Sequence, residues 1–286
     1  MSPTAGRLLI VATPIGNLGD ISPRAVEALR GADAIACEDT RHTKRLLVAH
    51  QIDRPCFSLH DHNEEARANE VVRRIEAGET VALVSDAGTP LISDPGYRVV
   101  RACHAAGLVV THLPGPCAAL AAVVLSGLPT DDIRFVGFLP EKGGRRREAL
   151  AALAGQATTL VFYESPKRLL AALTDVEETL GELPTAVARE LTKIHEEVVT
   201  GSASQVRDAF AERASIKGEC VVVLDLRPTR GDGIPDAALS CMLGALVASG
   251  NSRSSAVKRV VEWTGVPKNR VYALALEDEE AEGDER

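Results

Sequence analysis

A short apolar run and the loop that follows it occupy residues 81–96, whose sequence is VALVSDAGTPLISDPG. The run is typical of a strand in a parallel sheet, and the loop contains two aspartates, two glycines and two prolines. Open α/β sheets bind ligands in a crevice at the carboxyl ends of their strands. The stretch therefore predicts a strand that ends in a binding loop, although Asp94 and Pro95 also fit a simple helix start.

Apolar, β-branched runs recur along the chain and alternate with segments of helical period. The runs lie at residues 8–11, 34–37, 81–84, 108–113, 133–138, 159–163, 185–188 and 220–224. Such alternation predicts a largely parallel α/β architecture. Proline- and glycine-rich breaks then divide the chain. The expected parts are an N-terminal α/β domain (1–113), a C-terminal α/β domain (114–226), a linker (227–236), a helical module (237–276) and a disordered acidic tail (277–286).

Composition limits the class of protein. Of the 286 residues 45% are hydrophobic, and the longest unbroken apolar run has nine residues, too few for a membrane span. The amino terminus lacks the apolar core of a signal peptide, so we expect a cytoplasmic protein. The six cysteines form no Cys-x-x-Cys pair, which predicts reduced thiols and no structural metal.

The net charge of −8 is unevenly distributed. Residues 277–286 contain seven acids and one arginine and carry −6, which leaves only −2 for the rest of the chain. Residues 252–270 carry five basic residues against one glutamate. Local basic surface is therefore compatible with an RNA partner.

The helical module shows apolar residues at helical spacing in 239–247 and 256–261, and Pro267 is expected to open a third short helix. Its basic residues predict phosphate contacts or, equally, the solvated face of a dimerisation unit.

Four further segments of similar character follow predicted strands, at residues 13–20, 113–118, 162–168 and 189–193. The chain contains neither Gly-x-Gly-x-x-Gly nor the phosphate loop Gly-x-x-x-x-Gly-Lys-Ser/Thr. A Rossmann dinucleotide site and a P-loop nucleotide site are therefore disfavoured.

Five motifs in order resemble the tetrapyrrole methylase family, and within it the members that methylate ribosomal RNA. They are ATPIGNLGD (12–20), CEDTR (37–41), SDAGTP (85–90), PGP (114–116) and YESPKR (163–168). The resemblance covers about residues 7–276. It implies two α/β domains with S-adenosylmethionine in the cleft between them, a homodimer, and methyl transfer to the ribose 2′-oxygen of a cytidine in the decoding centre of 16S rRNA.

The resemblance also implies which residues hold the methyl donor. They are Pro14, Gly16, Asn17, Leu18, Asp86, Ala87, Gly88, Thr89, Gly115, Pro116, Cys117, Ala118, Tyr163 and Leu191. Such loops offer many main-chain hydrogen bonds, each contributing about 0.5–1.5 kcal/mol. We expect Asp86 to be the polar anchor of the donor, with a capping role as the alternative.

Transfer to a hydroxyl also requires a group that accepts its proton. Residues in or beside the strand-end motifs are Glu38, Asp39, Lys44, His60, Glu164 and Lys193, of which we favour Glu38, with Lys193 as the second catalytic candidate. The sequence HDHNE (60–64) fits an RNA-facing loop, a helix-capping loop or, less well, a metal site.

Phosphate contacts are predicted at twelve residues: Arg41, Lys44, Arg45, His60, Arg145, Arg146, Arg147, Lys167, Arg168, Arg253, Lys258 and Arg259. The arginine run 145–147 equally fits a solvated helix start. Aromatic residues make up only 3% of the chain, so charge and shape are expected to dominate RNA contact over base stacking.

Two other functions remain open. A family enzyme that methylates a tetrapyrrole would keep the cleft, but the basic segments favour a polyanion. A non-catalytic RNA-binding or assembly protein would have no need of intact donor loops.

Overall fold

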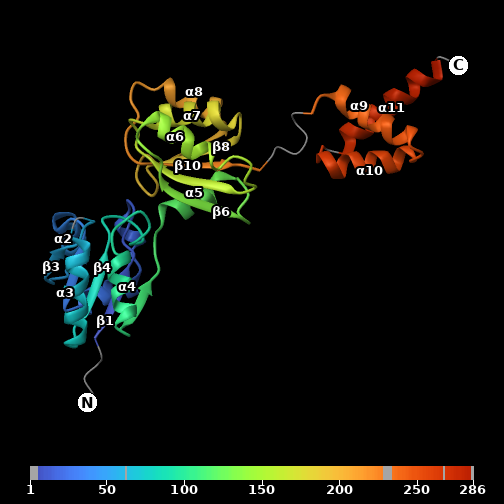
Figure 1. Ribbon diagram of the computed structural model, residues 1–286. Helices are drawn as coiled ribbons and strands as arrows, with labels where there is room; N and C mark the ends of the chain where they lie inside the picture. The colour runs from blue at the N-terminus through green and yellow to red at the C-terminus, as the bar shows by residue number, and fades with distance from the viewer. Residues whose placement is uncertain (1–5, 62, 228–233, 267, 285–286) are drawn as a thin grey trace. The chain divides into compact units, whose positions relative to one another are not determined.

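The computed structural model describes residues 6–61, 63–227, 234–266 and 268–284 (Figure 1). The chain forms two compact units. The larger consists of Met1–Ala154 with Thr158–Asp225, and the smaller of Gly155–Ala157 with Leu226–Arg286. The larger unit contains two β-sheets, and the smaller unit is helical.

The first sheet has five strands in the order β3-β2-β4-β1-β5, and every pair is parallel. The strands are β1 (Arg7–Val11), β2 (Ala34–Cys37), β3 (Cys56–Ser58), β4 (Thr80–Val84) and β5 (Val109–Leu113). This part of the fold confirms the predicted parallel α/β architecture. The sequence did not predict β3, because a three-residue strand gives too short a periodic signal.

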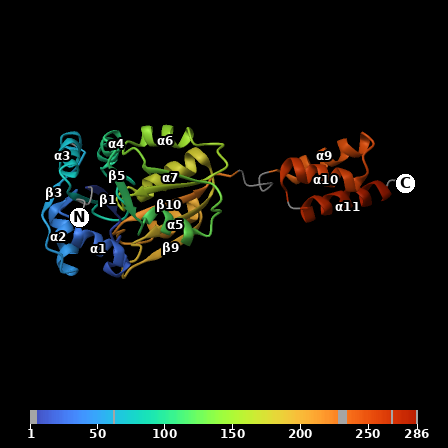
Figure 2. The same ribbon diagram turned by 90° about the horizontal axis from the view of Figure 1, so that it is seen from below.

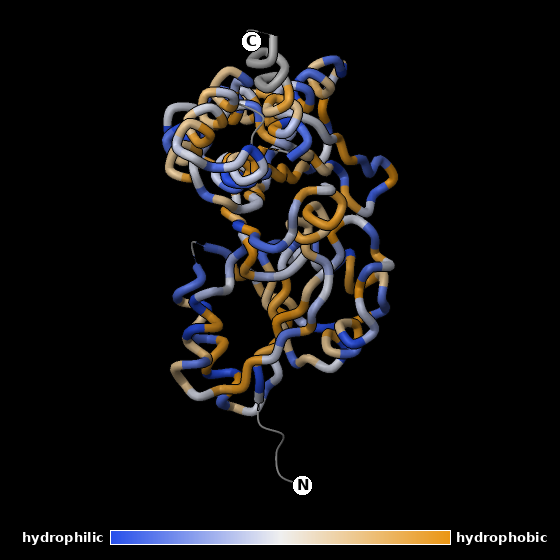
Figure 3. Tube along the Cα trace, turned by 90° about the vertical axis from the view of Figure 1, so that its right-hand side faces the viewer, coloured by the Kyte–Doolittle hydropathy of each residue, from blue (hydrophilic) through white to orange (hydrophobic). Residues whose placement is uncertain are grey.

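Alternate residues of each strand pack against helices on opposite faces of this sheet, as the two-residue period of a strand requires. Leu9, Val11 and their neighbours pack on α1 (Pro23–Gly31) and α2 (Thr40–Ala49). Leu8 and Ile10 pack on α3 (Glu64–Glu76) and α4 (Tyr97–Ala105). The strands are accordingly among the most hydrophobic parts of the trace in Figure 3.

The loop after β4 is fixed at both ends. Near its start, Thr13 and Gly88 exchange main-chain hydrogen bonds of 2.8 and 3.1 Å. At its end, helix α4 begins after Gly96, which has no side chain to cap the helix. A carboxylate oxygen of Glu64, from α3, accepts hydrogen bonds from the amides of Gly96 (2.9 Å) and Arg98 (2.7 Å) instead. The alternative that Asp94 caps this helix is therefore wrong.

The second sheet has the order β6-β7-β10-β8-β9. Its strands are β6 (Ile133–Phe138), β7 (Thr159–Glu164), β8 (Pro184–Arg189), β9 (Glu197–Ser202) and β10 (Cys220–Asp225). Only β6 and β7 pair in parallel, and the other three pairs are antiparallel. The prediction of a largely parallel architecture is wrong for this sheet. The short connection 190–196 returns the chain antiparallel into β9, a strand that the sequence did not predict, and β10 then enters antiparallel between β7 and β8.

Helix α5 (Ala118–Ser126) covers one face of this sheet, where Ala122 and Val123 pack on Val161 and Val223. Helices α6 (Gly143–Ala151), α7 (Leu169–Leu180) and α8 (Ala203–Ala211) lie on the other face (Figures 1 and 2).

A buried ion pair joins α6 to α7. The guanidinium of Arg146 donates to the Asp175 carboxylate at 2.6 Å, and both side chains are 6% exposed. Arg147 reaches the other oxygen of the same carboxylate at 2.8 Å from a half-exposed position. The prediction that Arg146 contacts RNA phosphate is therefore wrong, because its charge is enclosed and already paired.

The smaller unit consists of α9 (Asp236–Ala248), α10 (Arg253–Thr264) and α11 (Lys268–Asp284), with Leu239, Leu243, Val257 and Val260 in its core. Met242, Val247 and Val261, predicted on the same faces, are more exposed. Residues 277–284 continue α11, so the predicted disordered tail is helical up to Asp284, because half of these residues are glutamate, which favours helix. Pro267, residues 285–286 and 228–233 of the predicted linker lie outside the described residues.

Among the residues that the structure describes, we find no helix with the length and apolar character needed to span a bilayer.

We expect Asp175→Ala to lower the free energy of unfolding by about 3–5 kcal/mol, because it leaves the Arg146 charge buried without a partner. Arg147→Ala is the matched control, and we expect it to cost about 1 kcal/mol or less because its side chain is half in solvent. Urea denaturation of both variants measures the difference. Equal losses in the two variants would contradict the assigned role of the buried pair.

Candidate functional site

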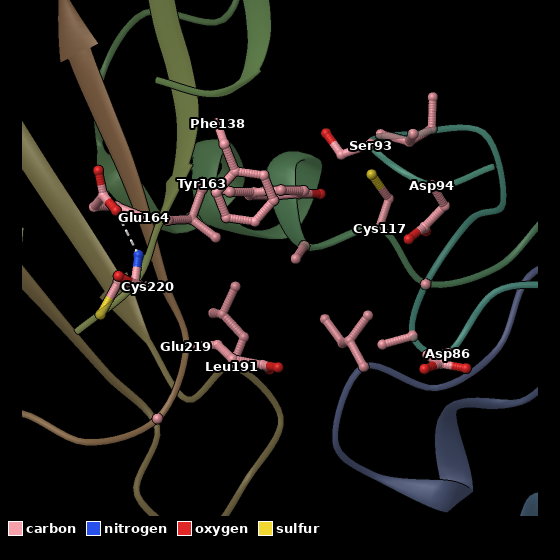
Figure 4. A pocket seen from close by; sticks show the side chains of 18 of the residues that line it. Asp86, Ser93, Asp94, Cys117, Phe138, Tyr163, Glu164, Leu191, Glu219 and Cys220 are labelled. Atoms are coloured by element: carbon pink, nitrogen blue, oxygen red, sulfur yellow. Dashed lines mark hydrogen bonds between the residues drawn. The ribbon is translucent and has the colours of Figure 1, made fainter. Parts of the chain in front are cut away.

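The larger unit contains a cavity of about 410 Å³ (Figure 4). Loops of both sheets contribute to its wall. The first sheet supplies Ile15, Asp86, Ala87, Gly88, Thr89, Ile92, Ser93 and Asp94. The rest of the lining consists of Cys117, Ala118, Phe138, Tyr163, Glu164, Ser165, Pro166, Leu191, Gly218, Glu219, Cys220 and Val221.

Strand order explains why these segments meet. Strands β4, β1 and β5 are neighbours and parallel, so the loops that follow them leave the same edge of the first sheet. In the second sheet β7 and β8 also end at the cavity. Strand β10 runs antiparallel between them, and Val221 lies beside Tyr163 of β7 and Ala188 of β8. The amino-terminal end of β10 therefore completes the wall.

Eight of the fourteen predicted donor residues line the cavity: Asp86, Ala87, Gly88, Thr89, Cys117, Ala118, Tyr163 and Leu191. The other six, Pro14, Gly16, Asn17, Leu18, Gly115 and Pro116, do not belong to its lining. Several of these hold the wall in place. The carbonyl of Pro116 accepts a hydrogen bond of 2.9 Å from the Thr89 hydroxyl. A Cβ on Gly16 would lie 2.9 Å from the carbonyl oxygen of Leu191, so only glycine fits there.

Of the remaining lining residues, the sequence assigned only Ile15 to the donor site, as part of the loop 14–18. Ile92, Ser93, Asp94, Ser165 and Pro166 lie inside segments already singled out, so the loop pattern had indicated their neighbourhood. Residues 218–221 follow no predicted strand end. Their position depends on the antiparallel direction of β10, which periodicity does not reveal.

The backbone is strained in two loops at the cavity. Leu91 and Ser93 have φ of 73° and 67°, and Glu190 and Thr192 have φ of 52° and 64°. Non-glycine residues adopt this left-handed region rarely, and β-branched threonine least easily. Such strain persists where surrounding structure enforces it and is concentrated at functional sites.

Carboxylates dominate the charge of the cavity wall. Asp86 accepts a hydrogen bond of 3.1 Å from the amide of Asp39, which ties together the loops after β4 and β2. Burial, and after it the nearby charges of Glu38, Asp86 and Asp61, raise the pKa of Asp94 to about 7, although a hydrogen bond from Ser85 lowers it. Asp94 thus titrates near neutral pH.

The two predicted catalytic residues lie outside the lining. Glu38 follows β2, which β4 separates from β1, and its side chain is exposed. Although the residue is exposed overall, partial removal of solvent from its carboxyl group, and then the charge of Asp86, raise the pKa of Glu38. For Lys193, partial burial lowers the pKa, but hydrogen bonds to Glu190 (2.7 Å) and Glu219 (3.0 Å) outweigh it and raise the pKa overall. Lys193 therefore stays protonated.

Glu164 supports the loop that follows β7. One of its carboxylate oxygens accepts hydrogen bonds of 2.7 Å from the amide of Ser165 and from the guanidinium of Arg168. Tyr163 packs in the α5 core, so the alternation of the strand turns the Glu164 side chain to the other face. The acid therefore positions the loop, and it already holds Arg168, a predicted phosphate contact.

The other predicted phosphate contacts differ in accessibility. Exposed positions are Arg41, Lys44, Arg45, Arg145, Arg147, Lys167, Lys258 and Arg259, and partly buried ones are His60, Arg168 and Arg253. In the HDHNE segment the Asn63 side chain accepts a hydrogen bond of 2.9 Å from the His60 amide, while His62 lies outside the described residues. No group of three metal-ligating side chains occurs in the described parts of the chain.

Comparison with known proteins gives two kinds of likeness. Residues 7–207 match the family model of the tetrapyrrole (corrin/porphyrin) methylases. The chain is 46% identical over 274 residues to ribosomal RNA small subunit methyltransferase I of Synechocystis, covering 95% of this chain and 98% of that protein. It is 45% identical over 279 residues to the Escherichia coli O157:H7 protein of the same name, covering 96% of each.

Solved structures share the fold at much lower identity. The methyltransferase CobJ has a TM-score of 0.57 and 21% identity, covering 80% of this chain and 97% of its own. Uroporphyrin-III C-methyltransferase of Thermus thermophilus, complexed with S-adenyl homocysteine, has a TM-score of 0.53 and 18% identity, covering 77% and 98%. The larger unit has two sheets, and loops of both form the wall of one cavity. The family model matches most of the chain, and relatives are identical to it at nearly half of the aligned positions. The chain therefore belongs to the tetrapyrrole methylase family.

Proposed function

We propose that this enzyme transfers a methyl group from S-adenosylmethionine to the ribose 2′-oxygen of a cytidine in the decoding centre of 16S rRNA. The observation that carries the proposal is full-length identity of 45–46% to proteins named ribosomal RNA small subunit methyltransferase I. The chain is a methyltransferase, and its methyl donor is S-adenosylmethionine.

The chemistry of the cavity wall suits this donor. Asp86, Asp94, Glu164 and Glu219 line it, with Glu164 already paired to Arg168, whereas its described lining contains no lysine, arginine or histidine. A wall of this charge favours a ligand with positive groups, and the donor has a sulfonium and an ammonium. When bound, the donor supplies an electrophilic methyl group.

Close backbone packing supports the same assignment. Gly88 has φ of 81°, and a Cβ there would lie 3.2 Å from the Ile15 side chain. The loop can therefore present main-chain groups to a ligand without an intervening side chain. We propose that the Asp86 to Thr89 loop, Cys117, Ala118, Tyr163 and Leu191 hold the donor by such contacts.

Asp94 is the carboxylate that we propose as acceptor of the ribose hydroxyl proton. It lines the cavity, and a group that titrates near 7 both holds and releases a proton at physiological pH. Glu38 and Lys193 stay predictions. Glu38 lies one strand further along the sheet, and Lys193 is engaged by two carboxylates.

RNA contact is proposed for the exposed cations. Arg41, Lys44 and Arg45 lie on α2, and Arg145 and Lys167 follow strands that end at the cavity. In the helical module Lys258 and Arg259 are exposed on α10. Exposed lysine and arginine bind RNA phosphates without reading sequence.

Two further expectations remain proposals. A homodimer is supported by large apolar side chains left exposed on α5 and β5: Leu120 (58%), Val124 (77%), Leu125 (46%) and Val109 (55%). Action in the cytoplasm is supported by the ribosomal substrate in the names of the relatives. A tetrapyrrole acceptor is less well supported, because the solved methyltransferases of this fold share only about 20% identity with the chain. A non-catalytic role is less well supported, because the relatives at 45–46% identity are named as methyltransferases.

Unmethylated 30S subunits incubated with labelled S-adenosylmethionine and the wild-type enzyme test the proposal. We expect label on the ribose of one cytidine of 16S rRNA, mapped by nuclease digestion and mass spectrometry. Label on a base, or label on a tetrapyrrole and none on the subunit, would refute it.

Asp86→Asn removes the charge but keeps an oxygen that can accept the Asp39 amide. We expect the affinity for S-adenosylmethionine to fall about tenfold or more, since a bond to a charged group contributes about 1.5–3 kcal/mol. Isothermal calorimetry measures the affinity. Asp61→Asn is the matched control, because Asp61 is exposed and does not line the cavity. An unchanged affinity in Asp86→Asn would remove Asp86 from the donor site.

Asp94 must be ionised to accept a proton, and with a pKa of about 7 it is mostly protonated at pH 6. We therefore expect kcat/KM of the wild type to rise with pH through about 7 and to level off above it. Asp94→Asn should lower kcat/KM about 100-fold or more and lose this rise. A variant that kept the wild-type pH profile would show that another group accepts the proton.

A further inference from the structure

Phe138 is an apolar side chain left in solvent beside the cavity. It ends β6, lines the cavity and is 58% exposed. The aromatic residues of the chain are few, yet Phe138 and Tyr163 both line the cavity and Phe135 packs on Tyr163. Burial of a phenylalanine is normally favourable, so an exposed ring inside a binding site indicates a partner that the free protein lacks.

The backbone of β6 directs this ring toward the cavity. The pairing of β6 with β7 shifts register between Phe135 and Phe138, as in a β-bulge, and Gly137 has a left-handed φ of 68°. Bulges beside active sites turn a side chain away from the regular alternation. A Cβ on Gly137 would lie 3.0 Å from the Ser93 hydroxyl, so the bulge packs closely against the loop after β4.

The ring of Tyr163 contacts the Phe138 ring. The two ring centroids lie 5.5 Å apart, and the two planes meet at 64°. Phe135 contacts Tyr163 in the same edge-to-face manner at 4.9 Å. An edge contact supports Phe138 while leaving a face of the ring for a flat ligand. Figure 4 shows Phe138 and Tyr163 together, with Ser93 and Asp94 across the cavity.

Phe138 is much more exposed to solvent than the other apolar residues of the cavity wall. Ile15, Leu191 and Val221 are 9%, 6% and 4% exposed, whereas Phe138 is more than half exposed. The deep part of the wall can enclose a small donor. A nucleotide that belongs to a large RNA must enter from the solvent side, where Phe138 lies.

The charges around the cavity also favour a nucleotide of RNA as the ligand beside Phe138. Lys142 and Arg145, at the start of α6, are exposed and lie within seven residues of Phe138. The carboxylates of the cavity wall repel phosphates, so the phosphates remain outside with these cations. Only the neutral nucleoside is then free to enter the cavity.

We propose that Phe138 stacks on the nucleobase of the nucleotide to be methylated, which is turned out of the RNA into the cavity. The proposal rests on the proposed function. Enzymes that modify nucleotides commonly turn the target out and stack its base on an aromatic side chain. Base stacking therefore contributes at this one position, although the scarcity of aromatic residues predicted that it would be minor.

Three substitutions of Phe138 separate stacking from simple apolar packing. Phe138→Leu keeps an apolar side chain but removes the aromatic face, Phe138→Ala removes both, and Phe138→Trp keeps the face. We expect kcat/KM on unmethylated 30S subunits to fall about 5- to 150-fold in the leucine and alanine variants, the fold-change that corresponds to about 1–3 kcal/mol for one stacked base. The tryptophan variant should remain within about threefold of the wild type.

Calorimetry with S-adenosyl homocysteine is the second readout, and each variant should bind it as the wild type does. Ile133→Ala is the matched control, because Ile133 is an exposed apolar residue at the other end of β6. An equal loss of S-adenosyl homocysteine affinity would show that Phe138 contacts the donor, and full activity of Phe138→Leu would show that no stacking occurs. Either result overturns the proposal. Absence of ribose methylation by the wild type refutes the proposed function instead.

Discussion

The pairing of β1 with β4 on one side and β5 on the other is the constraint on which the site depends. All three strands run in the same direction, so their carboxyl ends deliver three loops to one edge of the sheet. The hydrogen bonds between Thr13 and Gly88 then lock two of these loops together. A strand in the opposite direction at any of these places would send its loop to the far edge, and the cavity would lose that part of its wall.

Local sequence predicted the features that depend on local physics. The apolar runs gave eight of the strands, and the glycine- and proline-rich loop after β4 was recognised as a binding loop whose residues 86–89 line the cavity. Features set by pairing over long distances were not predicted. Residues 218–221 reach the cavity only because β10 is antiparallel, and Glu38 lies aside because β4 stands between β2 and β1. The pairing of Arg146 was not predicted either, because its partner Asp175 lies 29 residues away and only the packing of α6 on α7 brings the two together.

Acidic and basic side chains near the cavity lie in different places. Acidic groups line the cavity, where burial and then nearby carboxylates raise the pKa of Asp94, and cations such as Lys142, Arg145 and Lys167 remain exposed. A positively charged donor is attracted inward by this arrangement, whereas a polyanion is held outside by it. The strained residues of two loops, Ser93 and Thr192 among them, show that the wall is maintained at a cost in backbone energy.

The hydrogen bonds that Glu64 accepts help to position the part of the cavity wall that carries Asp94. The Glu64 carboxylate belongs to α3 but serves the first turn of α4, so the two helices share one anchor. The loop between β4 and α4 is held at two points, at Gly88 by Thr13 and at Gly96 by Glu64. The span between these two points includes Leu91, Ser93 and Asp94, so Asp94 depends for its position on Glu64, a residue that does not itself line the cavity.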